Sequence, residues 1–337
     1  MERPTLKTIA AATGLAVATV SRALKDAPDI GEETKRRVRE TAALLGYRPN
    51  RAGVRLRTGK TNVIGLVLST EADVINHTAR MIYSIAAALR NTAYHLVVMP
   101  YFSDQDPMVP IRYIVETGSA DGVVLNQIMP DDPRIRYMAE RGFPFVAHGR
   151  SNMGIDHPYF DFDNEAFARL GVRSLTSRKR RHLFMVAPPR AQSYAGHMIA
   201  GFADEAALQG ATSEIAESVN SDSVSEQIEE AVYRRFAAAA RPDGLLLGST
   251  TAAMAAVNGA ERAGLRIGED FDVVAKEAIS FLRRFRKEII VVHEDVGLAG
   301  DFLARALIAA IERRAPEQGQ FLDQPDHVEA GDTPHRR

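Results

Sequence analysis

The 337-residue chain contains no cysteine. This absence excludes disulfides, thiolate nucleophiles and zinc sites ligated by cysteine. The sequence also lacks any run of about 18 apolar residues, so we expect no transmembrane helix and no membrane partner. Its polar first residues, from Met1 to Lys7, contain no apolar signal core, and we therefore expect a cytoplasmic protein.

Common catalytic and cofactor motifs are also missing. The sequence contains no GxGxxG, P-loop or GxSxG pattern, so we expect no cofactor and no enzymatic activity. Four residues near the middle of the chain could suggest a metal site: Asp156, His157, Asp161 and Asp163. They do not form HxH or HExxH spacing, and we expect no metal there.

The near-zero net charge of −1 hides an uneven distribution. Residues 1–60 contain 13 Lys and Arg against 6 Asp and Glu, a net charge of +7, while the remainder carries −8. A basic head on an acidic body indicates a small polyanion-binding module joined to another domain. A solvated charged helix is the alternative, and charge alone does not decide between the two.

Periodicity predicts three short helices near the N-terminus. Thr5 can cap the first of these helices, and Gly14 would end it. A tight turn then leads to a second helix over residues 17–25, a spacing typical of the helix-turn-helix. The third helix is expected between Gly31 and Gly46. Periodicity alone would fit any three-helix bundle.

The second of these helices exposes residues suited to the major groove of DNA. Arg22 can bind a guanine bidentately, worth roughly 1–3 kcal/mol of discrimination, while Val17 and Ala18 suit thymine methyl groups. Three hydroxyl groups can bind phosphates, which positions a helix without reading sequence: Thr19, Ser21 and Thr34. Each hydroxyl taken alone also fits an ordinary residue on a helix surface.

The head resembles that of the lac and gal repressor family of bacterial transcriptional regulators. The resemblance is carried by residues 5–10, 14–24 and 45–50 and is nearly continuous through this region. It implies that the base readers are Val17, Ala18 and Arg22. It also implies further DNA contacts from Thr5, Leu6, Tyr47, Asn50, Arg51 and Leu56. Ala16 departs from the family, which often has a phosphate-binding serine there.

The resemblance also implies that residues 49–60 form a hinge, which is disordered in the free protein and helical on DNA. Leu56 matches the family leucine that wedges between central base steps and kinks the duplex. Gly53 favours instead a flexible basic linker, because a glycine inside a helix costs about 1 kcal/mol relative to alanine.

From residue 61 onward, short apolar runs alternate with helical stretches such as 76–92. This pattern indicates βαβ units and parallel sheets, and the length fits two lobes. The expected strands are 63–68, 95–99, 122–125, 144–147, 182–187, 244–247, 272–275 and 289–293. The segments 121–125 and 162–164 extend the family resemblance into this region, where it implies a fold like that of periplasmic sugar-binding proteins.

The expected fold is an all-α helix-turn-helix head followed by a two-lobed α/β core with parallel sheets. The expected boundaries are a head at 1–48, a hinge at 49–60, an N-lobe at 61–162 completed by about 293–320, a C-lobe at 163–292, and a polar tail at 321–337. Some family members tetramerise through leucine heptads, which this tail lacks. We therefore expect a homodimer on a pseudo-palindromic double-stranded operator.

Ligands of open α/β sheets bind beyond the carboxyl ends of the strands, here between the lobes. The resemblance places an effector at Ser69, Asn126, Asp163, Ser249, Glu277 and Glu294, whose carboxylates and amides suit polyols. The family often has an arginine at the position of Met198. The adjacent His197 could replace that arginine, so we add His197 to the expected effector contacts. Asp163 can also cap a helix beginning at Asn164. Lys276 and Glu277 depart from the family's Gly-Phe-Asp run and could pair with each other.

These features predict a DNA-binding transcriptional repressor controlled by a small-molecule effector, a sugar or sugar derivative. A non-sugar metabolite is the alternative effector. Two remote alternatives are a solute-binding protein, which would have no use for residues 1–60, and a sugar-acting enzyme, which would need a catalytic constellation that the sequence does not offer.

Overall fold

The computed structural model describes residues 4–47, 59–69, 75–102, 104–315, 319–325 and 328. Contacts divide the chain into two units, Met1–Thr61 and Asn62–Arg337. Within the described ranges, no helix combines the length and the apolar character that crossing a membrane requires.

The first unit is a three-helix bundle made of α1 (Leu6–Thr13), α2 (Val17–Ala23) and α3 (Glu32–Leu44). Its core consists of Ile9, Ala10, Val20, Ala23, Val38 and Ala42. The Thr5 hydroxyl caps α1 by accepting the backbone N–H of Thr8, and Gly14 ends the helix at φ +69°. The three helices predicted from the sequence are therefore confirmed.

The second unit begins with a lobe, here called the N-lobe, built on a parallel six-stranded sheet of order β11-β5-β4-β3-β1-β2. Its strands are β1 (Val63–Ser69), β2 (His95–Tyr101), β3 (Gly122–Leu125), β4 (Phe145–His148), β5 (Tyr159–Phe162) and β11 (Gln320–Asp323). Its helices are α5 (Ile75–Ala88), α6 (Met108–Thr117), α7 (Pro133–Glu140) and α13 (Val296–Ile311).

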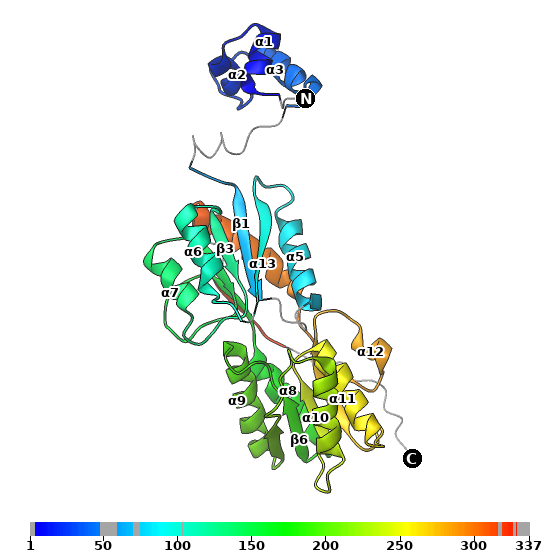
Figure 1. Cartoon of the computed structure of the whole chain (residues 1–337). Helices are drawn as coiled ribbons and strands as arrows, with labels where there is room; N and C mark the ends of the chain where they lie inside the picture. Colours follow the sequence, from blue (N-terminus) through cyan, green and yellow to red (C-terminus); the bar gives the residue numbers. More distant parts are fainter. Residues whose placement is uncertain are drawn as a thin grey trace. The chain divides into compact units, whose positions relative to one another are not determined.

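Helices cover both faces of this sheet. Successive side chains of a strand point to opposite faces, so neighbouring residues pack into different cores. Helices α5 and α13 cover one face, and α6 and α7 cover the other (Figure 1). Leu66 belongs to the core formed with α5 and α13, and the next residue, Val67, belongs to the core formed with α6 and α7. Both faces are therefore buried, which explains why β1 is apolar throughout and not alternating.

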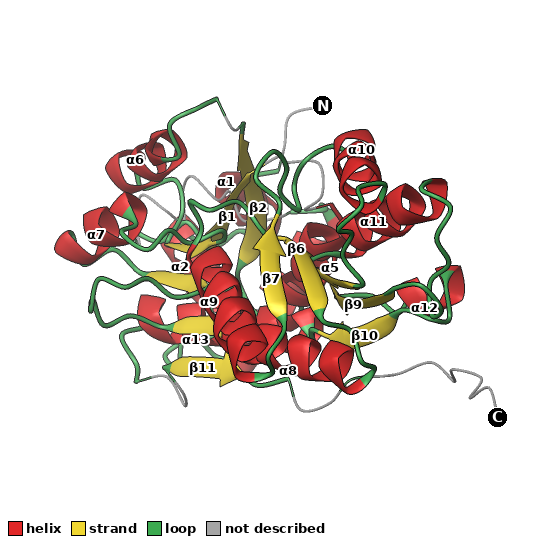
Figure 2. Cartoon of the chain, turned by 90° about the horizontal axis from the view of Figure 1, so that it is seen from below, coloured by secondary structure: helices red, strands yellow, loops and turns green. Residues whose placement is uncertain are grey.

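The other lobe, the C-lobe, has a parallel five-stranded sheet of order β10-β9-β8-β6-β7. Its strands are β6 (His182–Val186), β7 (Thr212–Ile215), β8 (Gly244–Leu247), β9 (Asp272–Glu277) and β10 (Ile290–His293). Its helices are α8 (Asn164–Ser177), α9 (Ser193–Leu208), α10 (Ser225–Phe236), α11 (Thr250–Arg262) and α12 (Leu282–Phe285) (Figure 2).

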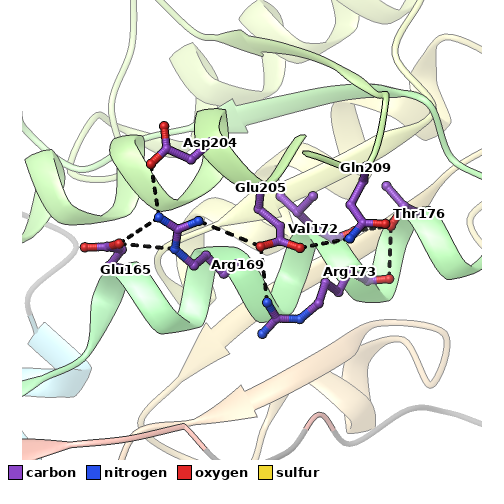
Figure 3. Close-up of polar contacts among 8 residues, drawn as sticks. All are labelled: Glu165, Arg169, Val172, Arg173, Thr176, Asp204, Glu205 and Gln209. Carbon is purple, nitrogen blue, oxygen red and sulfur yellow. Dashed lines mark hydrogen bonds and ion pairs between the residues drawn. The ribbon is translucent and has the colours of Figure 1, made fainter. Parts of the chain in front are cut away.

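An ionic network joins α8 to α9 on one side of the C-lobe sheet (Figure 3). The carboxylate of Glu205 lies 3.2 Å from Arg173 and 3.8 Å from Arg169, and it accepts a hydrogen bond from Gln209 at 2.9 Å. Arg169 also pairs with Glu165 at 2.9 Å. Glu205 is thus a buried carboxylate fully engaged with neighbours on these two helices.

Within the described residues, the chain passes between the two sheets after β5 and again after β10. Beyond β11, Val328 packs against the C-lobe core. The sequence pattern did not predict three of the strands: β5, β7 and β11. In β5 the charged Asp161 interrupts the apolar run. The residues of β7 are mostly exposed, and β11 is a short segment with polar ends. The expected polar tail from residue 321 is wrong at its start, since β11 pairs with β5 as far as Asp323. The expected helix over 76–92 ends earlier, at Ala88.

Candidate functional site

The helix predicted to read DNA presents its N-terminal side chains to solvent. Val17, Ala18 and Arg22 are exposed on α2, while Val20 packs into the bundle core. The guanidinium of Arg22 forms an ion pair with Asp29, in the segment that leads to α3. The reading face predicted from the sequence is therefore available on the head.

The other residues expected to contact DNA differ in how accessible they are. Thr5 is exposed at the start of α1, and the half-buried residues are Leu6, Thr19, Ser21, Thr34 and Tyr47. Leu6 and Tyr47 pack against the bundle core, which gives each a structural role as well. The expected hinge contacts Asn50, Arg51 and Leu56 lie outside the described residues.

A cavity lies between the N-lobe and the C-lobe, with about 1030 Å³ of empty space that includes part of its open mouth. Residues from both lobes line it. The N-lobe contributes Asn126, His148, Arg150 and Asp161, and the C-lobe contributes Asn164, Ser193, Tyr194, Ser249 and Lys276. Most follow the carboxyl ends of parallel strands or begin helices, as expected for ligand sites in such sheets.

A buried ion pair lies in the cavity wall. The ammonium of Lys276, on β9, lies 2.8 Å from Oε2 of Glu294, and Oε1 of Glu294 lies 3.3 Å from Nε2 of His77 on α5. Burial alone would raise the pKa of Glu294, but Lys276 and His77 outweigh it and hold that pKa well below its usual range. Glu294 is therefore an anion that links a cation of the C-lobe to α5 of the N-lobe.

His148 is a neutral imidazole in this cavity, because burial lowers its pKa to about 3. Its Nδ1 lies 3.4 Å from Oδ1 of Asn126, while its Nε2 is buried without a hydrogen-bond partner among the described residues. With the proton on Nδ1, directed at Asn126, the Nε2 lone pair is left as an unused acceptor on a residue of the cavity wall.

Arg150 and Asp161 form a second ion pair, with Nε and Oδ2 2.9 Å apart. Their alignment does not make a hydrogen bond, so both atoms keep unused hydrogen-bonding capacity within the described part of the chain. Burial raises the pKa of Asp161 to about 7, although Arg150 and Lys276 act in the opposite direction. This pair offers a ligand one donor and one acceptor side by side.

Three of the predicted effector residues line the cavity: Asn126, Ser249 and Glu294. The Ser249 hydroxyl also caps α11 by accepting the backbone N–H of Ala252 at 3.2 Å. The others, Ser69, Asp163, His197 and Glu277, are not among the residues that line it. Ser69 is buried at the end of β1, and His197 is half-buried on α9 beside the fully buried Met198.

The two predicted carboxylates outside the cavity wall have structural partners. Asp163 caps α8 by accepting the backbone N–H of Ala166 at 2.9 Å, and its other oxygen accepts from Gln324 at 2.7 Å. Glu277 accepts the backbone N–H groups of Phe281 and Leu282 at the start of α12. The suggested pairing of Lys276 with Glu277 is wrong, because Lys276 pairs with Glu294.

A cluster of potential metal ligands also lies here, since His77, His148 and Glu294 place one ligand atom each within 4.8 Å of one another. The sequence offered no sign of it, because the three residues are far apart along the chain. Lys276 already neutralises Glu294, so a divalent cation would enter beside a buried ammonium. Like charges in a low-dielectric site repel strongly, which disfavours a metal at this position.

Sequence reasoning missed several residues of the cavity wall that the strand-end rule could have found. His148 directly follows the strand expected at 144–147, Arg150 comes two residues later, and Asn164 begins the helix after β5. In the sequence Asp161 suggests a metal ligand, yet its position inside a buried strand between two phenylalanines marks it as a group that needs a partner.

Comparisons with known proteins agree with this architecture. Residues 5–50 match the family described as bacterial regulatory proteins, lacI family, and residues 172–333 match a periplasmic binding protein-like domain. The HTH-type transcriptional regulator AglR of Rhizobium meliloti (strain 1021) is 30% identical over 321 residues, covering 93% of this chain and 90% of AglR.

Two solved structures share the fold. The lac repressor dimer bound to operator and the anti-inducer ONPF aligns with a TM-score of 0.85 at 20% identity, over 98% of this chain and 99% of the other. A complex of the transcriptional regulator CelR with cellobiose aligns with a TM-score of 0.69 at 22% identity, over 98% and 100%. With AglR matched along nearly its whole length and the helix-turn-helix head in place, this chain belongs to the lacI family of bacterial regulatory proteins and is a DNA-binding transcriptional regulator of that family.

Proposed function

We propose that this regulator is a repressor that binds a pseudo-palindromic operator as a homodimer and is controlled by a sugar or sugar derivative in the interlobe cavity. Residues 1–48 act as the DNA-binding head, 49–60 as the hinge, and the two lobes as the effector-binding core. Ligand binding changes the relative position of the lobes, and this movement is coupled to operator affinity.

The observation that carries the effector proposal is a set of buried polar atoms without hydrogen-bond partners among the described residues. In residues of the cavity wall these atoms are His148 Nε2 and Ser193 Oγ, together with Arg150 Nε and Asp161 Oδ2, which face each other as an ion pair without a hydrogen bond. Leaving such an atom unsatisfied costs about 1–3 kcal/mol. Hydroxyl groups both donate and accept, so adjacent hydroxyls of a sugar can satisfy these donors and acceptors together. The related CelR–cellobiose complex supports the same ligand class.

The DNA-binding proposal assigns base contacts to Val17, Ala18 and Arg22, which are exposed together on α2. The N-terminal part of a recognition helix is the part that reaches base edges in the major groove. Thr19, Ser21 and Thr34 then serve as phosphate contacts. Leu56 is proposed, on the family resemblance, as the minor-groove wedge.

A homodimer is supported by the outer strand of the N-lobe sheet. β2 lies at the edge of that sheet, and Val97 and Val98 on it are each 38% exposed. Tyr83, on the neighbouring helix α5, is 65% exposed. Exposed apolar groups beside an open strand edge favour association. A second copy is the natural occupant, because two heads match an operator whose symmetry mirrors that of a dimer.

The experiment combines operator selection, ligand screening and DNA-binding measurements. Operator sites selected from random duplexes would serve in fluorescence anisotropy, with the oligomeric state measured by sedimentation. Thermal shift would screen neutral sugars including cellobiose, maltose and raffinose beside non-sugar metabolites. We expect a sugar to raise the melting temperature, change operator affinity at least tenfold and remain chemically intact.

The variant Asp161→Asn should lose at least tenfold in sugar affinity, because an NH2 donor replaces one of the two carboxylate oxygens, whereas the exposed Asp204→Asn on α9 should not. Regulation by a non-sugar metabolite with no response to any sugar would overturn the effector proposal. A monomer on a single half-site would overturn the dimer.

A further inference from the structure

Lys276, one of the positively charged residues of the cavity wall, is already paired within the protein. The Lys276 ammonium donates to Glu294 at 2.8 Å and to Oδ1 of Asn164 at 3.0 Å, and it lies 4.9 Å from the centre of the Phe162 ring. Two of its three N–H groups are therefore committed, and the aromatic face takes up part of the remaining side. This buried lysine has little capacity left for a ligand.

The second cation of the cavity wall is compensated as well. Arg150 lies 2.9 Å from the Asp161 carboxylate, so each described lysine or arginine lining the cavity faces a carboxylate at ion-pair distance. His148 adds no charge near neutral pH, because burial lowers its pKa to about 3. Asp222 contributes a further carboxylate to the wall. Above pH 7, where Asp161 is ionised, neither of the two described lysine and arginine side chains in the wall, Lys276 and Arg150, carries an uncompensated positive charge.

An anionic ligand would have to take a cation away from its carboxylate. A phosphate at Lys276 would displace Glu294, or lie beside it, and two anions in a buried site repel each other strongly. An uncharged hydroxyl has no such conflict, because it can donate to a carboxylate and accept from the neighbouring N–H without separating the pair.

We infer that Glu294 determines the charge selectivity of the effector site: by holding Lys276, it restricts the cavity to uncharged polyhydroxy ligands and excludes phosphorylated or acidic sugars. This inference rests on the sugar-effector proposal and adds that the sugar is neutral. It also makes Glu294 a residue whose neutralisation changes specificity and not affinity alone.

The test uses the full-length protein and matched pairs of sugars. Isothermal titration would compare cellobiose with cellobiose 6′-phosphate and maltose with maltose 6′-phosphate, with inorganic phosphate as a further probe. The wild-type protein should bind the neutral member of an effective pair at least tenfold more tightly than its phosphate. In Glu294→Gln the preference should shrink at least tenfold, because the freed Lys276 ammonium now receives the phosphate. In Lys276→Met/Glu294→Gln the gain should disappear, since no cation remains at that position.

Glu205→Gln is the matched control, because Glu205 is another buried glutamate in ion pairs and does not line the cavity (Figure 3). Its sugar preference should equal that of the wild type. A wild-type protein that binds a sugar phosphate as tightly as the neutral sugar overturns the inference without any variant, even if Glu294→Gln fails to fold. Unchanged selectivity in a folded Glu294→Gln also overturns it. If neither neutral nor phosphorylated sugars bind, the proposed effector class is wrong, and the inference that rests on it is wrong as well.

Discussion

The guanidinium of Arg22 forms an ion pair with the carboxylate of Asp29, so the expected guanine reader is held by its own head when DNA is absent. Both side chains are about half exposed, with 57% and 47% of their surfaces accessible. Pairs of this kind contribute roughly 0–1 kcal/mol, because water and salt screen them. The pair can therefore position Arg22 without preventing it from reaching a base.

Replacing Arg22 should change operator preference as well as affinity. Arg22→Ala should cost about 1–3 kcal/mol of binding to the selected operator and relax one position of the site, because a bidentate contact to guanine is lost. Asp29→Asn should keep the preference and bind the same operator up to about fivefold more tightly, since an exposed ion pair no longer competes. Anisotropy on single-base operator variants measures both. An unchanged preference in Arg22→Ala would remove Arg22 from the reading surface.

Two glycines of α9 should respond in opposite directions to alanine. A Cβ at Gly201 would meet the backbone carbonyl oxygen of Glu165 far inside van der Waals contact, whereas one at Gly196 meets nothing within 4 Å. Gly201→Ala should destabilise the core by about 1–3 kcal/mol or more, because backbone must move. Gly196→Ala should stabilise it by roughly 0.5–1 kcal/mol through helix propensity. Chemical denaturation gives both values, and equal effects would contradict the close packing of α8 against α9.

The buried Asp161 should make stability depend on pH in an unusual direction. Its pKa rises from 3.8 to about 7, so between these values the folded protein keeps a proton that the unfolded chain has released. The contribution of this group to the free energy of unfolding therefore decreases as pH rises through that window, by at most about 1.4 kcal/mol per pH unit. Denaturation of wild type and Asp161→Asn from pH 4.5 to 7.5 would show the difference. Parallel pH profiles would argue that Asp161 is ionised throughout.

Asp163 should be important for stability, since both of its carboxylate oxygens have partners within the protein. Asp163→Ala removes the cap of α8 and the bond to Gln324, and should lower the free energy of unfolding by about 0.5–2 kcal/mol. We expect its sugar affinity to stay close to that of the wild type. A lost effector response at unchanged stability would instead place Asp163 in the binding site, as the family resemblance implies.

The head and most strands could be predicted because their signals are local. Thr5 and Gly14 mark the two ends of α1 by capping chemistry, and each expected strand of the core is an apolar run. β7 was not predictable in this way, because an exposed edge strand needs no apolar pattern. β11 could not be predicted either, since its pairing with β5 joins segments far apart in the chain.

The position of the cavity could be predicted from the sequence, but only some of the residues that line it could. Asn126 and Glu294 could be predicted because they follow the carboxyl ends of expected strands, and His148 could have been predicted in the same way. The partner of Lys276 was not predictable, because an adjacent glutamate, Glu277, competes for it in sequence. Side chains of successive strand residues point to opposite faces, so Lys276 and Glu277 cannot meet, and the parallel register of β9 with β10 brings Glu294 within reach instead.

The pairing of β11 with β5 also sets an order of assembly during synthesis. The C-lobe is one continuous stretch from α8 to β10, so all of its strands have left the ribosome once residue 293 emerges. The N-lobe begins earlier but must wait for α13 and for Gln320–Asp323 before its core and sheet are complete. Domains generally fold as units during synthesis, and a lobe cannot complete its sheet before its last strand has emerged. The lobe that is translated first is therefore finished last, and until then β5 presents an open edge.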